Sequence, residues 1–378
     1  MDERSTAVGA VLDLLRNDGP LTRAQLLERT GMARSTLVEK VETLRRHGLV
    51  RDAEVRRGTG GRPATALAFD GAGRIMLLAD LGATHGTFAV ADLHLRLLAV
   101  RRQRLDTMAG PDAVLPAVVA AARSLLGGHR EPLLGVGVGF PGPVAADRRT
   151  LPEQTMLRGW DGADLAAVLG SAFGVPVLVE NDANAMAFGE HLAAVRAGAP
   201  RGESLLVVKV STGIGAGLVI GGALHRGASA GAGEIGHVRL AGAAARCTCG
   251  SRGCLGAVAS GRALLRRLRR RGARRLPDIV RDAVAGDGPT LDAVREAGAQ
   301  LGAVLAAAVT MVDPHAVLLG GEIGRLPAFV DAVREPLYRR VPARTARRLR
   351  LHRTVLDDES VITGLAGLVV DAELAAVR

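Results

Sequence analysis

Apolar residues recur at helical spacing three times in the first fifty residues, which predicts three short amphipathic helices. The first covers residues 5–17 and stops at the sequence Asp18-Gly19-Pro20. The second begins after Thr22, which forms a capping-box pattern with Gln25 three residues later. The third covers residues 33–47, so the chain opens with a small helical domain.

Two short strands follow these helices and flank a glycine-rich tip. The first strand starts at Gly48, the tip covers residues 58–63, and the returning strand covers residues 64–69. Three helices and a two-stranded hairpin form a winged helix-turn-helix, which we expect over residues 1–70. Its third helix can enter the major groove, and its wing can reach the backbone or the minor groove. The candidate DNA contacts are Arg34, Ser35, Thr36, Lys40 and Arg62. A helical interaction domain without a DNA role is the alternative.

From Arg74 onward, short buried strands alternate with helices. Strands are expected at residues 75–80, 87–92, 95–100, 133–140, 175–179, 205–210 and 317–319, with an Ala-rich helix at 111–126. Several of these strands end in turns that contain glycine or aspartate. This pattern indicates an α/β protein whose ligand binds at the carboxyl ends of the strands.

Two of these turns have the composition of phosphate-holding loops. Glycine lets backbone N–H groups approach an anion, and threonine hydroxyls can donate further hydrogen bonds. Either turn alone is a weak signal, but Asp182 and a Gly-Gly pair follow other strands at compatible positions. The residues concerned are Asp80, Gly82 and Thr84 in the first turn, Thr212, Gly213 and Gly215 in the second, and Gly320 with Gly321.

The three cysteines of the chain fall within eight residues and follow a histidine. His237, Cys247, Cys249 and Cys254 supply one imidazole and three thiolates, the ligand set of a closed structural zinc site. No position is left open for water, so we expect Zn²⁺ to have a structural role. Free thiols beside an unrelated histidine are the alternative, and an iron–sulfur cluster would lack its fourth cysteine.

Composition narrows the class of protein. The 378 residues are 48% hydrophobic, which allows two or three domains, and no stretch is long and apolar enough to span a bilayer. Without a signal-peptide pattern, we expect a cytoplasmic protein. The net charge of +11 permits nucleic-acid binding, although residues 1–70 hold 12 basic and 10 acidic side chains. We interpret the basic run at 262–275 as a solvated helix face.

Together these motifs resemble the ROK family, which contains sugar kinases and sugar-responsive transcriptional repressors. The resemblance covers essentially the whole chain, and its most specific part is Gly233-Glu-Ile-Gly-His237 joined to the Cys-x-Cys-Gly-x-x-Gly-Cys segment. It implies that residues 74–378 form a sugar-kinase-like body of two α/β lobes with the actin-like ATPase fold and a sugar in the cleft. The winged helix before that body resembles the repressor branch.

The resemblance also implies a role for each matching residue. Asp182 matches the general base of the kinases, which accepts the proton of the attacking sugar hydroxyl. Asn181, Glu234 and His237 match further sugar contacts. The two glycine turns and the Gly320-Gly321 pair match the nucleotide contacts, so ATP and Mg²⁺ would be cofactors if kinase activity is retained.

Four positions depart from the kinase pattern. Ala83 stands where a second glycine is usual in the first phosphate turn, and Thr87 stands where an arginine is frequent. Gly256 replaces a sugar-binding glutamate, and Met156 replaces a sugar-binding asparagine. Each lost hydroxyl contact costs about 1–3 kcal/mol, which puts hexose binding, and still more efficient kinase activity, in doubt.

We therefore expect a transcriptional regulator, a repressor, that binds double-stranded DNA and responds to a sugar or phosphosugar effector. Two winged helices in a homodimer, or in a dimer of dimers, would have to match the half-site spacing of the operator. An ATP-dependent sugar kinase with Asp182 as its base is the second hypothesis. A DNA-binding protein whose body serves only dimerisation is the third.

Overall fold

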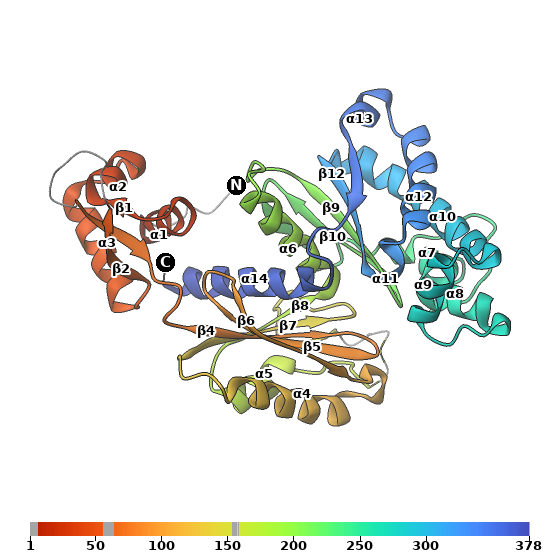
Figure 1. The fold of residues 1–378 in the computed structure, drawn as a ribbon, viewed down its shortest axis with the longest axis horizontal. Helices are drawn as coiled ribbons and strands as arrows, with labels where there is room; N and C mark the ends of the chain where they lie inside the picture. The colour runs from red at the N-terminus through yellow and green to blue at the C-terminus, as the bar shows by residue number, and fades with distance from the viewer. Residues whose placement is uncertain (1–6, 56–63, 153–156, 158, 378) are drawn as a thin grey trace.

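The computed structural model describes residues 7–55, 64–152, 157 and 159–377. Figure 1 shows a small N-terminal domain at one end and two α/β lobes beside it. Two residues of the sequence predictions, Arg62 and Met156, lie outside the described residues. Within the described part of the chain, no helix is both long enough and apolar enough to cross a bilayer.

The N-terminal domain has the predicted order of helices and strands. Its helices are α1 (Ala7–Asp18), α2 (Arg23–Thr30) and α3 (Arg34–Arg46). The capping box is confirmed, because the Thr22 hydroxyl accepts from the Gln25 N–H and the Gln25 side chain accepts from the Thr22 N–H. The structure adds a third strand, of only two residues, to the predicted two-stranded hairpin. The sheet order is β1-β3-β2, with β1 (Leu21–Thr22), β2 (Val50–Val55) and β3 (Ala64–Phe69).

The first lobe is a five-stranded mixed sheet covered by helices on both faces. Along β4 (Ile75–Leu81) the side chains alternate: Met76 and Leu78 pack with α14 (Ser360–Val377), whereas Leu77 and Ala79 pack with α4 (Pro111–Leu126) and α5 (Leu165–Phe173). The strand order is β6-β5-β4-β7-β8, made of β4 (Ile75–Leu81), β5 (His85–Asp92), β6 (Leu97–Arg104), β7 (Leu133–Phe140) and β8 (Val177–Asn181). The connecting helices are η1 (Thr107–Ala109), α4 (Pro111–Leu126) and α5 (Leu165–Phe173).

The second lobe repeats this layered arrangement. Leu205 and Val207 of β9 pack with α6, and the alternate residues Leu206 and Val208 pack with the outer helices. The strand order is β11-β10-β9-β12-β13, made of β9 (Leu205–Val210), β10 (Ile214–Ile220), β11 (Ala223–His225), β12 (Ala316–Gly320) and β13 (Arg350–Arg353). The helices are η2 (Ile235–His237), α7 (Leu255–Ala259), α8 (Gly261–Leu268), η3 (Arg269–Arg271), α9 (Leu276–Val284), α10 (Gly288–Val312), α11 (Gly321–Gly324), α12 (Pro327–Arg340), α13 (Ala343–Arg348) and η4 (Asp357–Glu359).

Two helices, α6 (Asp182–Arg196) and α14 (Ser360–Val377), cross between the sheets and join the lobes. Their backbones touch at the crossing: a Cβ on Gly364 would collide with the carbonyl oxygen of Ala185, and one on Gly189 with that of Ser360. The buried carboxylate of Glu190 accepts hydrogen bonds from the backbone N–H groups of residues 355 and 356. The loop before α14 is therefore fixed to α6.

The other end of α14 packs against the N-terminal domain (Figure 1). Arg16 of α1 pairs with Asp371 of α14 at 2.9 Å between Nη1 and Oδ1. The buried apolar residues of α1 and α14 also belong to one continuous hydrophobic cluster. The N-terminal domain and the body therefore share packed surface along this helix.

Helix α6 begins at Asp182, directly after strand β8, because Asn181 caps it. The predicted glycine turns need one correction. Gly215 was assigned to a glycine turn but lies in strand β10. Because glycine has no side chain, the hydropathy pattern gives little indication of this strand. A Cβ on Gly217 would collide with the Ala183 carbonyl oxygen, so β10 packs directly on α6.

We expect Gly364→Ala to lower the free energy of unfolding by about 3 kcal/mol, because the new methyl group forces α6 and α14 apart. Gly128→Ala is the matched control, since a Cβ there meets no atom within 4 Å. Urea denaturation of both variants measures the difference. Equal stability of the two variants would contradict the close backbone contact at this crossing.

Candidate functional site

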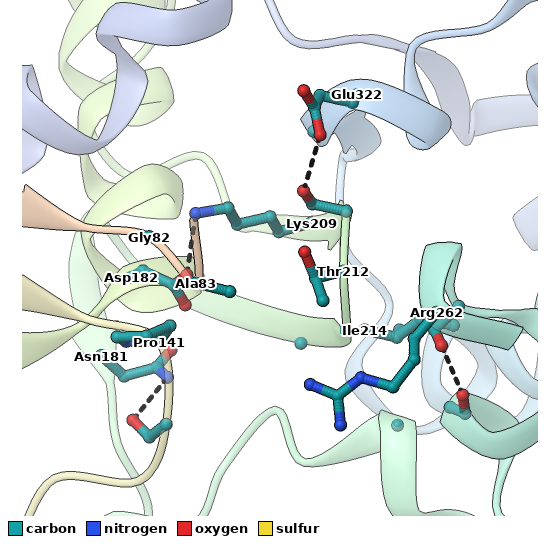
Figure 2. Close-up of a pocket in the computed structure, with 18 of the residues that line it drawn as sticks. Gly82, Ala83, Pro141, Asn181, Asp182, Lys209, Thr212, Ile214, Arg262 and Glu322 are labelled. Carbon is teal, nitrogen blue, oxygen red and sulfur yellow. Dashed lines mark hydrogen bonds and ion pairs between the residues drawn. The ribbon is translucent and has the colours of Figure 1, made fainter. Parts of the chain in front are cut away.

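A cavity of about 260 Å³ lies between the two lobes. The ends of β4 and β8 and the start of α6 line it from the first lobe, and the β9–β10 hairpin, η2 and α8 line it from the second. Figure 2 shows side chains from both lobes facing this space. The strands end here at their carboxyl edges, as the sequence predicts for a ligand site.

Asp182 lies at the first turn of α6, on the floor of the cleft. Its Oδ2 atom is 2.7 Å from Nζ of Lys209, which extends from β9 of the opposite lobe (Figure 2). Both side chains are largely buried, with 14% and 17% of their surfaces exposed. The predicted base therefore carries an ion-pair partner that the sequence predictions did not include. Lys209 has a sequence signal, since it is a lone charge in the apolar strand Leu-Leu-Val-Val-Lys-Val.

Asn181, a predicted sugar contact, lines the cleft beside Asp182. Its Oδ1 atom accepts hydrogen bonds from the N–H groups of Ala183 and Asn184, which caps α6. Its Nδ2 atom donates to the carbonyl oxygen of Gly142. The amide thus fixes the start of α6, and only its second N–H remains for a ligand.

The predicted phosphate turns face each other across the cleft. Seven of the eight proposed nucleotide contacts line it, and Gly320 does not; the seven are Asp80, Gly82, Thr84, Thr212, Gly213, Gly215 and Gly321. Ala83, Thr87 and Gly256, three of the four departures from the kinase pattern, also line the cleft. Burial raises the pKa of Asp80, and its Oδ1 atom has no hydrogen-bond partner among the described residues.

The predicted metal ligands converge at the rim of the cleft. One donor atom from each of His237, Cys247, Cys249 and Cys254 lies within 4.8 Å of the other three. The His237 Nδ1 atom is 3.6 Å from Sγ of Cys247, and the sulfurs of Cys249 and Cys254 are 3.7 Å apart. Tetrahedral zinc with bonds of about 2.3 Å places its sulfur ligands about 3.8 Å apart. This donor set therefore fits a zinc ion.

Glu234 connects the metal ligands to the cleft. Its Oε2 atom is 3.7 Å from Nε2 of His237, the ring nitrogen that faces away from the thiols. Burial raises the pKa of Glu234, and the charge of His237 opposes that rise. Gly233 and Gly236 bring this segment against β10, because a Cβ on either would collide with a backbone carbonyl oxygen of that strand. His237 and Glu234 are thus placed by one rigid turn.

The cleft also has basic side chains in its lining that the sequence analysis did not place there. The basic run at 262–275 is mostly exposed, as predicted, but Arg262 and Arg266 line the cleft. Figure 2 shows the Arg262 side chain directed into the cavity. Its guanidinium has no ion pair or side-chain hydrogen bond with the residues that the structure describes. Interpreting the whole run as a solvated face was therefore wrong at Arg262, which is half-buried, whereas Arg266 is exposed at the cleft.

In the N-terminal domain, Arg34 and Ser35 are exposed at the start of α3, and Thr36 is half-buried. No side chain caps the first turn of α3, so its free N–H groups face solvent. Lys40 is paired with Glu39 at 2.9 Å. That ion pair lowers the pKa of Glu39 and competes with phosphate for Lys40.

Comparisons with known proteins match both parts of the chain. The ROK family model matches residues 77–372, and the IclR helix-turn-helix model matches residues 8–53. This chain belongs to the ROK family. With a helix-turn-helix domain before its ROK body, it has the organisation of a ROK transcriptional regulator.

Three similar proteins illustrate this placement. The xylose repressor of Bacillus subtilis (strain 168) is 28% identical over 95% of this chain and 93% of its own length. The glucokinase of Streptomyces coelicolor is 32% identical over 64% of this chain and 80% of its own length. A crystal structure described as a ROK family transcriptional regulator, a homologue of the Escherichia coli MLC protein, has a TM-score of 0.82 at 22% identity, covering 98% of this chain and 96% of its own. This crystal structure and the present chain share the same fold.

We expect His237→Ala and Cys247→Ser to reduce bound zinc from about one ion per chain to nearly none, because each removes one of four ligands. His225→Ala is the control, since that histidine is exposed on β11 and away from the four-ligand cluster. Elemental analysis of the dialysed proteins gives the ratio. Full zinc content in the His237 variant would show that the metal is held elsewhere.

Proposed function

We propose that this protein is a transcriptional repressor whose DNA binding is controlled by a sugar derivative in the cleft between its lobes. The observation that carries the proposal is the packing of α14. The start of this helix and the loop before it border the cleft at Asp357, Asp358 and Val361. Its other end packs on α1 through the Arg16–Asp371 ion pair. One rigid element thus touches both the ligand site and the DNA-reading domain.

DNA binding is assigned to the exposed start of α3. Uncapped N–H groups at a helix N-terminus bind phosphate oxygens, and Arg34 beside them can pair with a phosphate or a guanine edge. Ser35 and Thr36 add hydroxyl donors, while Lys40 is the weaker candidate because Glu39 already neutralises it. Two chains in a symmetric dimer would place two α3 helices on neighbouring half-sites.

The sugar is assigned to the side of the cleft where Asn181, Asp182, Glu234 and His237 meet. Zinc on His237 and the three cysteines would hold the turn that carries Glu234 and so fix that side of the site. The ion has a structural role in this proposal, because all four of its positions are filled by protein ligands.

The effector is assigned a phosphate group as well as a sugar. Arg262 directs its guanidinium into the cleft, where it has no ion pair with the described residues (Figure 2). Burial and the nearby charge of Arg102 lower the pKa of His85 to about 4, so His85 adds no positive charge near neutral pH. A guanidinium without a counter-ion is matched by a phosphate, which it can bind through two hydrogen bonds.

The first test is genome-wide footprinting, followed by fluorescence anisotropy with the best-bound fragment. We expect specific binding at moderate salt, and a loss of about tenfold in affinity for Arg34→Ala. Arg348→Ala is the control, because that exposed arginine lies on α13 at the opposite end of the molecule (Figure 1). Equal affinity for the footprinted fragment and for random DNA would contradict the repressor proposal.

The second test is a thermal-shift panel of pentoses, hexoses and aminosugars with their phosphate esters. We expect a phosphate ester to raise Tm more than its parent sugar, and Arg262→Ala to weaken that ester's binding by about tenfold or more. Arg267→Ala on the same helix is the control, since Arg267 pairs with Glu296 outside the cleft. Arg262→Ala binding the ester as tightly as the control would refute the phosphate assignment.

A further inference from the structure

An ammonium group from one lobe pairs with a carboxylate of the other at the centre of the cleft, and two further carboxylates line the same cavity. Asp182 binds Nζ of Lys209 directly, and the charges of Asp80 and Glu322 also act on it. Burial disfavours the ammonium, but Asp182 and Asp80 outweigh burial and raise the pKa of Lys209 above its usual range. Lys209 is therefore a permanent cation at this place.

Asp80 lines the cleft beside this pair and forms no ion pair with the described residues. Its side chain is buried, and its Oδ1 atom lacks a hydrogen-bond partner among the described residues. A buried carboxylate without a compensating charge is costly. Lys209 supplies the larger part of that charge and Arg102 a smaller part, since both oppose the rise in the pKa of Asp80 that burial causes. The ammonium thus pairs with the carboxylate at the start of α6 and acts on the carboxylate of the first sheet through its charge alone.

Carboxylates facing a phosphate-binding cleft are where a phosphotransferase holds a divalent metal ion. Mg²⁺ requires near-octahedral oxygen ligands at about 2.0–2.1 Å. Here Asp182 Oδ2 is already bound to an ammonium 2.7 Å away, and a second cation between the same carboxylates would be repelled by Lys209. The cleft does not fit Mg²⁺ or an ATP–Mg²⁺ complex while Lys209 is in this position.

We propose that Lys209 is a built-in replacement for the divalent metal ion, so that the cleft binds its ligand without metal and does not transfer phosphate. The ammonium keeps the two carboxylates neutralised whether or not a ligand is present. It also pairs with Oδ2 of Asp182, one of the two oxygens through which this residue could act as a base. This inference goes beyond the proposed function, because a repressor could bind DNA equally well with or without a metal in its cleft.

The test uses Mn²⁺ as a probe on the full, zinc-loaded chain, with electron paramagnetic resonance to count bound ions. Mn²⁺ prefers oxygen ligands and leaves the thiolate site to zinc. We expect no Mn²⁺ in the cleft of the wild type or of Lys209→Arg, which keeps the charge. Lys209→Met removes the charge and nearly keeps the volume of the side chain, so this variant should bind Mn²⁺. At an Mn²⁺ concentration roughly 100 times the dissociation constant, its Tm should rise by about 5 °C.

Adding Asp182→Asn to Lys209→Met should abolish that Mn²⁺ binding and the gain in Tm. The proposal is overturned if the wild type binds Mn²⁺ in a manner that Asp182→Asn removes, or if folded Lys209→Met gains no Mn²⁺ site. Should Lys209→Met fail to fold, the wild-type spectra still decide, since bound Mn²⁺ that depends on Asp182 contradicts the proposal and its absence sustains it. None of these outcomes alters the expected DNA binding, so the two proposals fail separately.

Discussion

The contact between the backbones of α6 and α14 constrains the rest of this structure. Gly189 and Gly364 let the two helices meet without side chains between them, and both sheets pack on the resulting layer. The same two helices carry the functional groups, because α6 begins with Asp182 and α14 begins beside the cleft. A conformational change in the cleft is therefore resisted by this rigid helix crossing. It is accommodated mainly by movement of whole helices.

Most of the fold follows from local sequence. The capping box at Thr22, the strand at 133–140 and the strand at 205–210 were predicted with their observed limits, and a turn-forming segment follows each of the two strands directly. Strand β10 was missed because Gly215 and Gly217 at its start continue the pattern of a glycine turn, and their role depends on a helix distant in sequence. The metal ligands were found from spacing alone, whereas the Lys209–Asp182 pair requires knowing that two lobes face each other.

Charge is the property of this cleft that bears most directly on phosphate transfer. The fold is shared with a ROK glucokinase, and the predicted general base and most phosphate-turn residues line the cavity. In our proposal, a single lysine on β9 neutralises the carboxylates that would hold a metal ion. Arg262 adds a positive charge on the second lobe that has no ion pair among the described residues. Both charges suit a site that recognises an anionic ligand and keeps it intact.

The account depends most on communication between the cleft and α3 through α14. Linkage requires that DNA binding alter the cleft if the cleft alters DNA binding. Hydrogen exchange measured on the protein alone and bound to its footprinted DNA tests this directly. We predict altered exchange in α3, along α14, and in residues 355–363 at the border of the cleft. Changes confined to residues 7–69 would contradict the account, because the body would then be independent of the DNA-reading domain.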